Sequence, residues 1–66
     1  MNKYNIIEVK FSGIVKEVRA YANTIEEAKT AIKELISTEN IDLSTIEIED
    51  TETGNSYKVN AKLGGF

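Results

Sequence analysis

Hydrophobic and polar residues alternate in two neighbouring stretches near the start of the chain, residues 4–11 and 14–22. Alternation with a period of two is typical of a half-buried β-strand, and both stretches are rich in β-branched and aromatic residues. Ser12 and Gly13 separate the stretches, and glycine supplies the positive φ that a tight hairpin turn needs. Together the two stretches predict a β-hairpin.

The pattern leaves the register of this hairpin open between two pairings. A two-residue turn pairs Ile7 with Val18, whereas a turn one residue longer pairs Ile6 with Val18. In the first register, a second group of hydrophobic side chains would lie on the sheet face opposite a covering helix. A contiguous patch of that kind would mark a surface for a partner or for self-association. The residues of this candidate interaction surface are Tyr4, Ile6, Val15 and Tyr21.

A helix is predicted to begin after Thr24. The sequence Thr24-Ile-Glu-Glu27 has the form of a capping box, in which the Thr24 hydroxyl accepts from the Glu27 amide and the Glu27 side chain reaches back. Hydrophobic residues then recur at steps of three and four, as on one face of an amphipathic helix. This stripe consists of Ile25, Ala28, Ala31, Ile32, Leu35 and Ile36, and the stretch 37–40 is expected to be the helix end and a loop.

A second pair of alternating stretches, 45–50 and 57–63, flanks a turn centred on Gly54. This pattern predicts a second hairpin, in which Ile48 would face Val59. The inward side chains of its last strand would be Tyr57, Val59, Ala61 and Leu63. The order of elements is therefore β-β-α-β-β in one domain, residues 1–66. We expect an α+β fold with one helix packed on one face of a mostly antiparallel sheet of up to four strands.

The residue types that most enzymes use are missing, because the chain contains no His and no Cys. Without them there is no disulfide, no thiolate and no ordinary zinc ligand set, and few groups remain for nucleophilic or acid–base catalysis. We therefore expect a protein that is not an enzyme and has no cofactor and no metal. The absence of Cys fits a reducing compartment, and the first residues have no hydrophobic signal segment, so we expect a cytoplasmic location.

The charge is unevenly distributed along the chain. Residues 1–38 carry six basic and five acidic residues, whereas residues 39–66 carry six acidic residues and two lysines. Duplex nucleic acid is a poor partner for such a surface, because its affinity for proteins comes mainly from Lys and Arg. An acidic surface of this kind could instead imitate nucleic acid at a basic site of a host protein. The residues of this candidate acidic surface are Glu47, Glu49, Asp50 and Glu52.

Two resemblances to known families bear on these expectations. The hairpin, helix and second hairpin with a six-residue loop resemble the immunoglobulin-binding domains of streptococcal protein G, with residues 49–57 in the place of that loop. Lys3-Tyr4, Val18-Arg-Ala20 and Thr24-Ile-Glu-Glu-Ala28 resemble the start of small phage and mobile-element proteins of the DpnD/PcfM-like group. The first resemblance implies the fold, and the second implies an accessory protein without a defined activity.

The sequence thus favours a small binding protein that acts through a sheet face or an edge strand. Its expected partner is a protein, and a homodimer is expected because neither hairpin contains a Pro to block an edge strand. The longest uncharged hydrophobic runs are a few residues, too short for a membrane span. The alternative function is that of an acidic inhibitor at a basic site.

Overall fold

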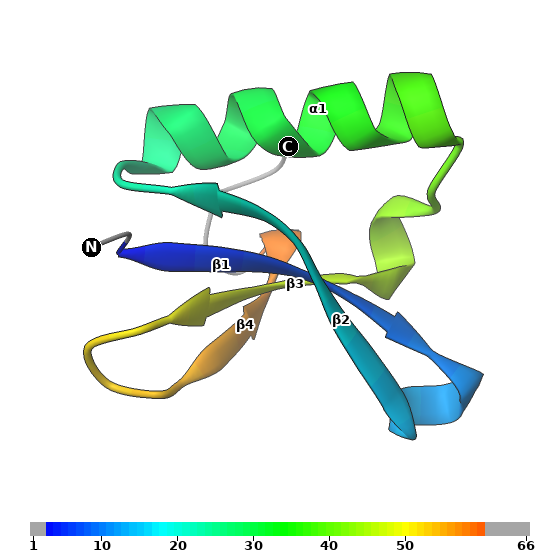
Figure 1. The fold of residues 1–66 in the computed structure, drawn as a ribbon, viewed down its shortest axis with the longest axis horizontal. Helices are drawn as coiled ribbons and strands as arrows, with labels where there is room; N and C mark the ends of the chain where they lie inside the picture. The colour runs from blue at the N-terminus through cyan, green and yellow to red at the C-terminus, as the bar shows by residue number, and fades with distance from the viewer. Residues whose placement is uncertain (1–2, 61–66) are drawn as a thin grey trace.

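The alternating stretches form strands and the hydrophobic stripe forms a helix in the computed structural model, which describes residues 3–60 (Figure 1). The strands lie in the order β2-β1-β3-β4, and each neighbouring pair is antiparallel. The helix covers one face of this sheet, so the predicted α+β fold is confirmed. The elements are β1 (Tyr4–Lys10), η1 (Phe11–Gly13), β2 (Val15–Ala22), α1 (Ile25–Glu39), η2 (Leu43–Thr45), β3 (Ile46–Asp50) and β4 (Ser56–Lys58).

Helix α1 begins and ends at residues that stabilise its exposed backbone groups. The Thr24 hydroxyl accepts from the Glu27 amide at 3.1 Å, and the Glu27 carboxylate accepts from the Asn23 amide at 3.2 Å. The predicted cap is therefore present, with the Glu27 side chain reaching one residue further back than a capping box requires. At the other end Asn40 adopts the left-handed conformation, with φ 54°, that commonly ends a helix. The helix consequently continues to Glu39, about one turn beyond its hydrophobic stripe.

The core lies between α1 and the inner face of the sheet, which we define as the face that contacts the helix. Its fully buried side chains are mostly isoleucines, and burying one such side chain contributes about 1.5–3 kcal/mol. Ala28 on the helix and Ala22 on β2 are small, so the helix backbone lies close to the strands. The residues of this core are Tyr4, Ile6, Ala22, Ala28, Ile32, Leu35, Ile46, Ile48 and Val59.

A β-bulge in the first hairpin decides which side chains enter this core. Near the turn, Ile7 pairs with Val18, as in the register of the two-residue turn. One step further Ile6 pairs with Ala20, so Arg19 is an extra residue in β2 without a partner position on β1. Because side chains alternate across a strand, Val18 lies with Ile7 on the outer face, and the insertion places Ala20 instead of Arg19 with Ile6 on the inner face.

The expectation that Tyr4, Ile6, Val15 and Tyr21 share the outer face is wrong. Tyr4 and Ile6 are buried beneath the helix, with exposed fractions of 6% and 0%. The bulge causes the difference, because it pairs these two residues with Ala22 and Ala20 on the inner face. Val15 pairs with Lys10, on the inner side near the turn, and only Tyr21 lies on the outer face, opposite Asn5.

The second hairpin also differs from its predicted register. Ile48 pairs with Tyr57 rather than with Val59, and β4 has only three residues. The loop is organised by Asp50, whose carboxylate accepts from the Glu52 amide at 2.9 Å. The Asp50 carbonyl accepts from the amide of Gly54 at 2.8 Å. Residues 59–60 turn out of the strand in a helical conformation, and the predicted inward residues Ala61 and Leu63 lie outside the described residues.

We predict that the isoleucine core determines the stability of this domain. Ile48→Val removes one methyl group from a site with 0% exposure, so it should lower the free energy of unfolding by about 0.5–1.5 kcal/mol. The matched control Ile14→Val removes the same group from a side chain that is 83% exposed, and should change stability by less than about 0.5 kcal/mol. Urea unfolding followed by circular dichroism measures both, and equal losses would contradict this core assignment.

Candidate interaction surface on the first hairpin

The tip of the first hairpin is a turn with left-handed backbone at three successive residues. Ser12 and Gly13 have φ values of 57° and 94°, the signs expected for a two-residue hairpin turn. The Ile14 amide donates to the Phe11 carbonyl at 3.2 Å and closes the turn. Phe11, which precedes these two residues, is also left-handed, with φ 53°.

Phe11 holds an unfavourable conformation without the burial that would compensate for it. A residue with a Cβ pays about 1–2 kcal/mol in the left-handed region, and aromatic residues seldom adopt it. The Phe11 side chain is nevertheless 73% exposed, so its packing within the domain recovers little of this cost. Strain of this kind persists at ligand-binding and recognition sites more often than elsewhere, which makes the tip a candidate site.

Exposed hydrophobic residues are concentrated on this same hairpin. Among residues 3–60, the large hydrophobic side chains that are exposed all lie on the tip and on β2. The two aromatic side chains among them present on the order of 250 Å² of surface to solvent. We call these residues the hairpin surface: Phe11 at 73%, Ile14 at 83%, Val15 at 36%, Val18 at 46% and Tyr21 at 61% exposure.

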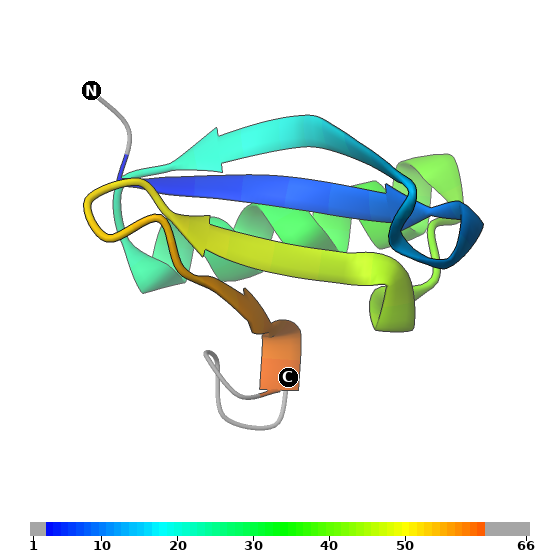
Figure 2. The ribbon, with the colours of Figure 1, turned by 90° about the horizontal axis from the view of Figure 1, so that it is seen from below.

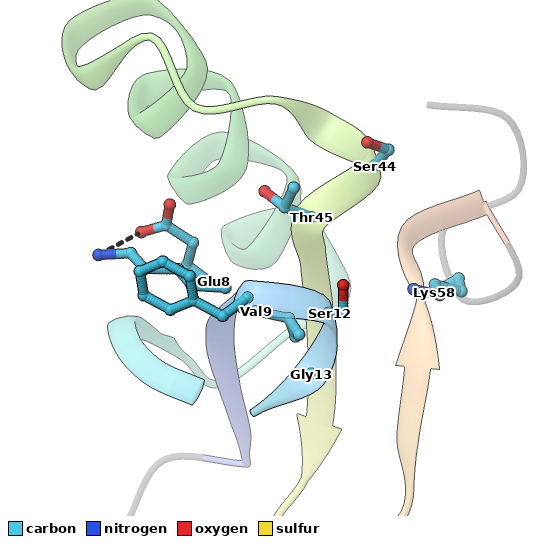
Figure 3. Close-up of a pocket in the computed structure, with 9 residues that line it drawn as sticks. Glu8, Val9, Ser12, Gly13, Ser44, Thr45 and Lys58 are labelled. Atoms are coloured by element: carbon cyan, nitrogen blue, oxygen red, sulfur yellow. Dashed lines mark ion pairs between the residues drawn. The ribbon is translucent and has the colours of Figure 1, made fainter. Parts of the chain in front are cut away.

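A broad hollow of about 670 Å³ lies beside the tip (Figure 3). Its wall is formed by the end of β1, by the turn, and by η2 and β4 across from it. Its polar groups come from both walls, and Val9 and Phe11 are its hydrophobic residues; the polar ones are Glu8, Lys10, Ser12, Ser44, Thr45 and Lys58. The hollow is open to solvent, whereas sites for small molecules enclose most of their ligand. This shape suits contact with a macromolecule better than enclosure of a substrate.

An ionic cluster lies on the inner side of the same hairpin, beyond the end of the helix. Lys10 contacts Glu17 at 2.9 Å and Glu8 at 3.8 Å. Arg19, the bulge residue, contacts Glu8 at 3.6 Å and Glu17 at 3.5 Å, and it pairs with Glu39 at the end of α1. The bulge therefore joins the hairpin to the last turn of the helix.

Among the described residues, the carboxyl groups of Glu17 and Asp42 have lowered pKa values. The Lys10 ammonium donates to Glu17, which lowers the pKa of the Glu17 carboxyl and raises that of Lys10. The Ser44 amide donates to the Asp42 carboxylate at 3.0 Å at the start of η2, which lowers the pKa of Asp42. The Lys10–Glu17 pair is half-exposed and the Asp42–Ser44 contact is exposed, so each contributes modestly to overall stability.

The candidate acidic residues do not form a continuous surface. Glu47 lies on the outer face between Lys16 at 3.7 Å and Lys58 at 3.5 Å, so its charge is largely balanced. Glu49 accepts a hydrogen bond from the Asn5 side chain at 2.8 Å. The Asp50 side chain is 9% exposed and accepts a hydrogen bond within the loop, so Glu52 is the exposed member of the set.

A metal-binding cluster, a membrane-spanning helix or a similarity to known proteins would each bear on the candidate site. Residues 3–60 contain no cluster of three side chains that could hold a metal ion. No helix within the same range is long and hydrophobic enough to cross a membrane. Comparison with protein-family models, with curated proteins and with solved structures yields no match for this chain. The candidate site therefore rests on its own geometry.

Sequence reasoning missed the residues that carry this surface. Strict alternation places Phe11 with Ile7, and Val18 with Ala20, on the face opposite Tyr4 and Ile6, so it does not mark either residue as exposed. The bulge that separates Val18 from Ala20 leaves no signature in the alternation. One signal for their exposure was visible in the sequence. Phe11 and Ile14 are large hydrophobic residues on both sides of a tight turn, and the core of a small domain seldom extends to a turn.

We predict that Phe11 strains the turn instead of stabilising it. Phe11→Asn places a residue that tolerates the left-handed region at the same position, so the free energy of unfolding should rise by about 0.5–1 kcal/mol. Thermal or urea unfolding of the variant measures the change. A loss of more than about 1 kcal/mol would mean that the Phe11 ring stabilises the tip through packing.

We also predict that stability falls in acid. The lowered pKa values of Glu17 and Asp42 mean that the folded state binds protons more weakly than the unfolded chain. Their contribution is therefore complete above the ordinary carboxyl values of 4.5 and 3.8, and is lost as the pH falls through the lowered values. Urea midpoints measured at decreasing pH below about 5 should decline less in the variant Glu17→Gln. An unchanged slope in that variant would contradict the role of the Lys10–Glu17 pair.

Proposed function

We propose that this protein is a small, non-enzymatic binding module that contacts a protein partner through the first hairpin. The observation that carries the proposal is the concentration of exposed hydrophobic side chains on one hairpin whose tip is held in a strained conformation. Phe11 and Ile14 at the tip are the proposed anchors, since centrally placed aromatic and aliphatic side chains provide most of the binding energy at protein interfaces. The Cys-free composition supports action in the reducing cytoplasm.

The arrangement of charges around the tip supports a protein partner over nucleic acid. Arg19 and Lys10 are paired with carboxylates, and Lys16 lies 3.7 Å from Glu47. Phosphate-binding surfaces instead present Lys and Arg side chains that are free to neutralise a backbone. Hydrophobic anchors surrounded by paired charges are typical of protein interfaces, whose centres are depleted in charge.

The alternative, an acidic inhibitor at a basic site, receives less support from the arrangement of its residues. Two lysines offset Glu47, and the side chain of Asp50 is used inside the loop. A surface that imitates nucleic acid needs unpaired charges of one sign over a wide area. The binding experiment below distinguishes the acidic inhibitor from the hairpin-binding module.

The binding experiment uses hairpin variants that preserve the core. A tagged wild-type protein and the double variant Phe11→Asn/Ile14→Asn are compared for capture of proteins from the cells that make it. Each captured protein is then purified and titrated. Because both side chains are exposed, the variant should remain folded by circular dichroism but bind the partner at least tenfold more weakly.

A matched control, Glu47→Gln/Glu49→Gln, removes charge from the outer face and leaves the tip intact. This control should bind as the wild type does. A partner that is retained by the tip variant and lost by the control would favour the acidic inhibitor. The proposal also fails if no protein is retained by the wild type and lost by the tip variant.

A further inference from the structure

Strand β2 forms one edge of the sheet and offers eight residues for pairing. The strand order β2-β1-β3-β4 leaves its outer edge without a neighbour, and Figure 2 shows no described element beyond it. The other edge strand, β4, has three residues. An edge strand presents free backbone N–H and C=O groups, and length, lack of Pro and hydrophobic side chains favour its pairing with another chain. Strand β2 has all three properties.

The hydrophobic side chains on the outer face are confined to the β2 side of the sheet. Val18 and Tyr21 are exposed there, whereas Glu47 and Glu49 cover the same face over β3. Packing of two outer faces against each other would bury these carboxylates at a high cost in desolvation. Contact along the edge of β2 avoids that cost, and it places the exposed hydrophobic residues of two chains together.

We propose that the protein forms a homodimer by antiparallel pairing of β2 with β2 of a second copy, about a two-fold axis at Val18. This inference rests on the proposed function, because it assigns a partner to the β2 part of the hairpin surface. In this register Val18 faces its own equivalent on the outer face. Glu17 then lies opposite the bulge, where Arg19 of the partner subunit carries the opposite charge.

The bulge makes this register consistent with the faces of both strands. Facing residues in an antiparallel pair point to the same side of the sheet. Next to Val18 in the pairing, Glu17 lies opposite both the partner subunit's Arg19 and the partner subunit's Ala20. Within one chain Ile6 lies opposite the same two bulge positions. Lys16 then faces Tyr21 of the partner subunit on the outer side, where an ammonium group and an aromatic ring attract each other.

Other two-fold registers of the β2–β2 pair are less favourable, because they place like charges opposite each other or pair fewer residues. A register centred on Glu17 places two carboxylates directly opposite each other, and one centred on Lys16 does the same with two ammonium groups. Like charges at facing positions destabilise a strand pair. A register centred on Tyr21 pairs only the last few residues of β2 and leaves Val15 and Val18 exposed.

The proposed dimer keeps both hairpin tips accessible. Because the two strands run in opposite directions, Phe11 and Ile14 of each copy lie at opposite ends of the joined strands. The pairing would bury on the order of 1,000 Å² in total, close to the lower limit for a specific interface. We therefore expect a dimer that dissociates at micromolar concentrations and presents two tips to the partner protein.

Disulfide cross-linking tests the position of the axis. The natural chain has no Cys, so Val18→Cys introduces a single thiol at the residue that faces itself. Facing residues in an antiparallel pair have Cα atoms about 4.5–5.5 Å apart, within the range of a disulfide. Under mild oxidation this variant should form a covalent dimer that reductant separates. The control Ser56→Cys, an exposed position on the opposite edge strand, should form much less.

Sedimentation velocity over a range of concentrations tests the dimer itself. The wild type should shift from monomer to dimer, and Val18→Asp, which sets two carboxylates face to face, should remain a monomer while Phe11→Asn dimerises normally. A wild type that is monomeric up to about 1 mM would overturn the proposal, as would equal cross-linking of the two Cys variants. Either result would leave partner capture by Phe11 and Ile14 intact, so the dimer and the proposed function fail separately.

Discussion

The first hairpin can place Ala20 and Ala22 beneath the helix with Ile6, and Tyr21 outside with Val18, only because β2 contains one more residue than β1 opposite Ile6. Without this insertion, strict alternation would place Val18, Ala20 and Ala22 on one face of the sheet. With it, the two small alanines lie beneath the helix beside Tyr4 and Ile6, and Val18 pairs with Ile7 on the other face. The composition of the core and that of the exposed surface are thus two consequences of one backbone feature.

The bulge also determines how the charged residues are used. Arg19 cannot take a regular position in the ladder, and its side chain instead reaches three carboxylates, including Glu39 at the end of α1. This contact connects the hairpin with the end of the helix, whose buried contacts with the sheet are made by Ala28, Ile32 and Leu35. A domain of this size has a thin core. Ion pairs between the sheet and the helix outside that core therefore add to the stability of their packing, even though each pair contributes little.

Patterns with a fixed period made most of the fold predictable. The capping sequence from Thr24 to Glu27 and the stripe that includes Ile32 indicated α1, and the alternation around Ile48 indicated β3. The end of the helix was predicted too early, because Asn40 ends it through backbone conformation and not through hydrophobicity. The register of the second hairpin was wrong, since the hydrogen bonds of Asp50 that set its loop are not encoded in alternation.

The candidate site was predictable only in part, and for the same physical reason. Tyr21 lies on the outer face as expected, but Tyr4 and Ile6 belong to the core. A single inserted residue reverses the faces of every position beyond it, and no local preference at Arg19 reveals the insertion. The shared outer position of Val18 and Tyr21 could be identified only after the pairing on both sides of Arg19 was known.

The most direct test of this account is a measurement of the strand register by nuclear Overhauser effects between backbone protons of the labelled protein. The account predicts that cross-strand contacts between Ile7 and Val18 occur together with contacts between Ile6 and Ala20, with Arg19 unmatched. Contacts between Ile6 and Val18, or a regular ladder in which Arg19 faces Ile6, would contradict it. Either of those patterns would place Val18 and Tyr21 on opposite faces of the sheet and remove the basis for their shared surface on β2.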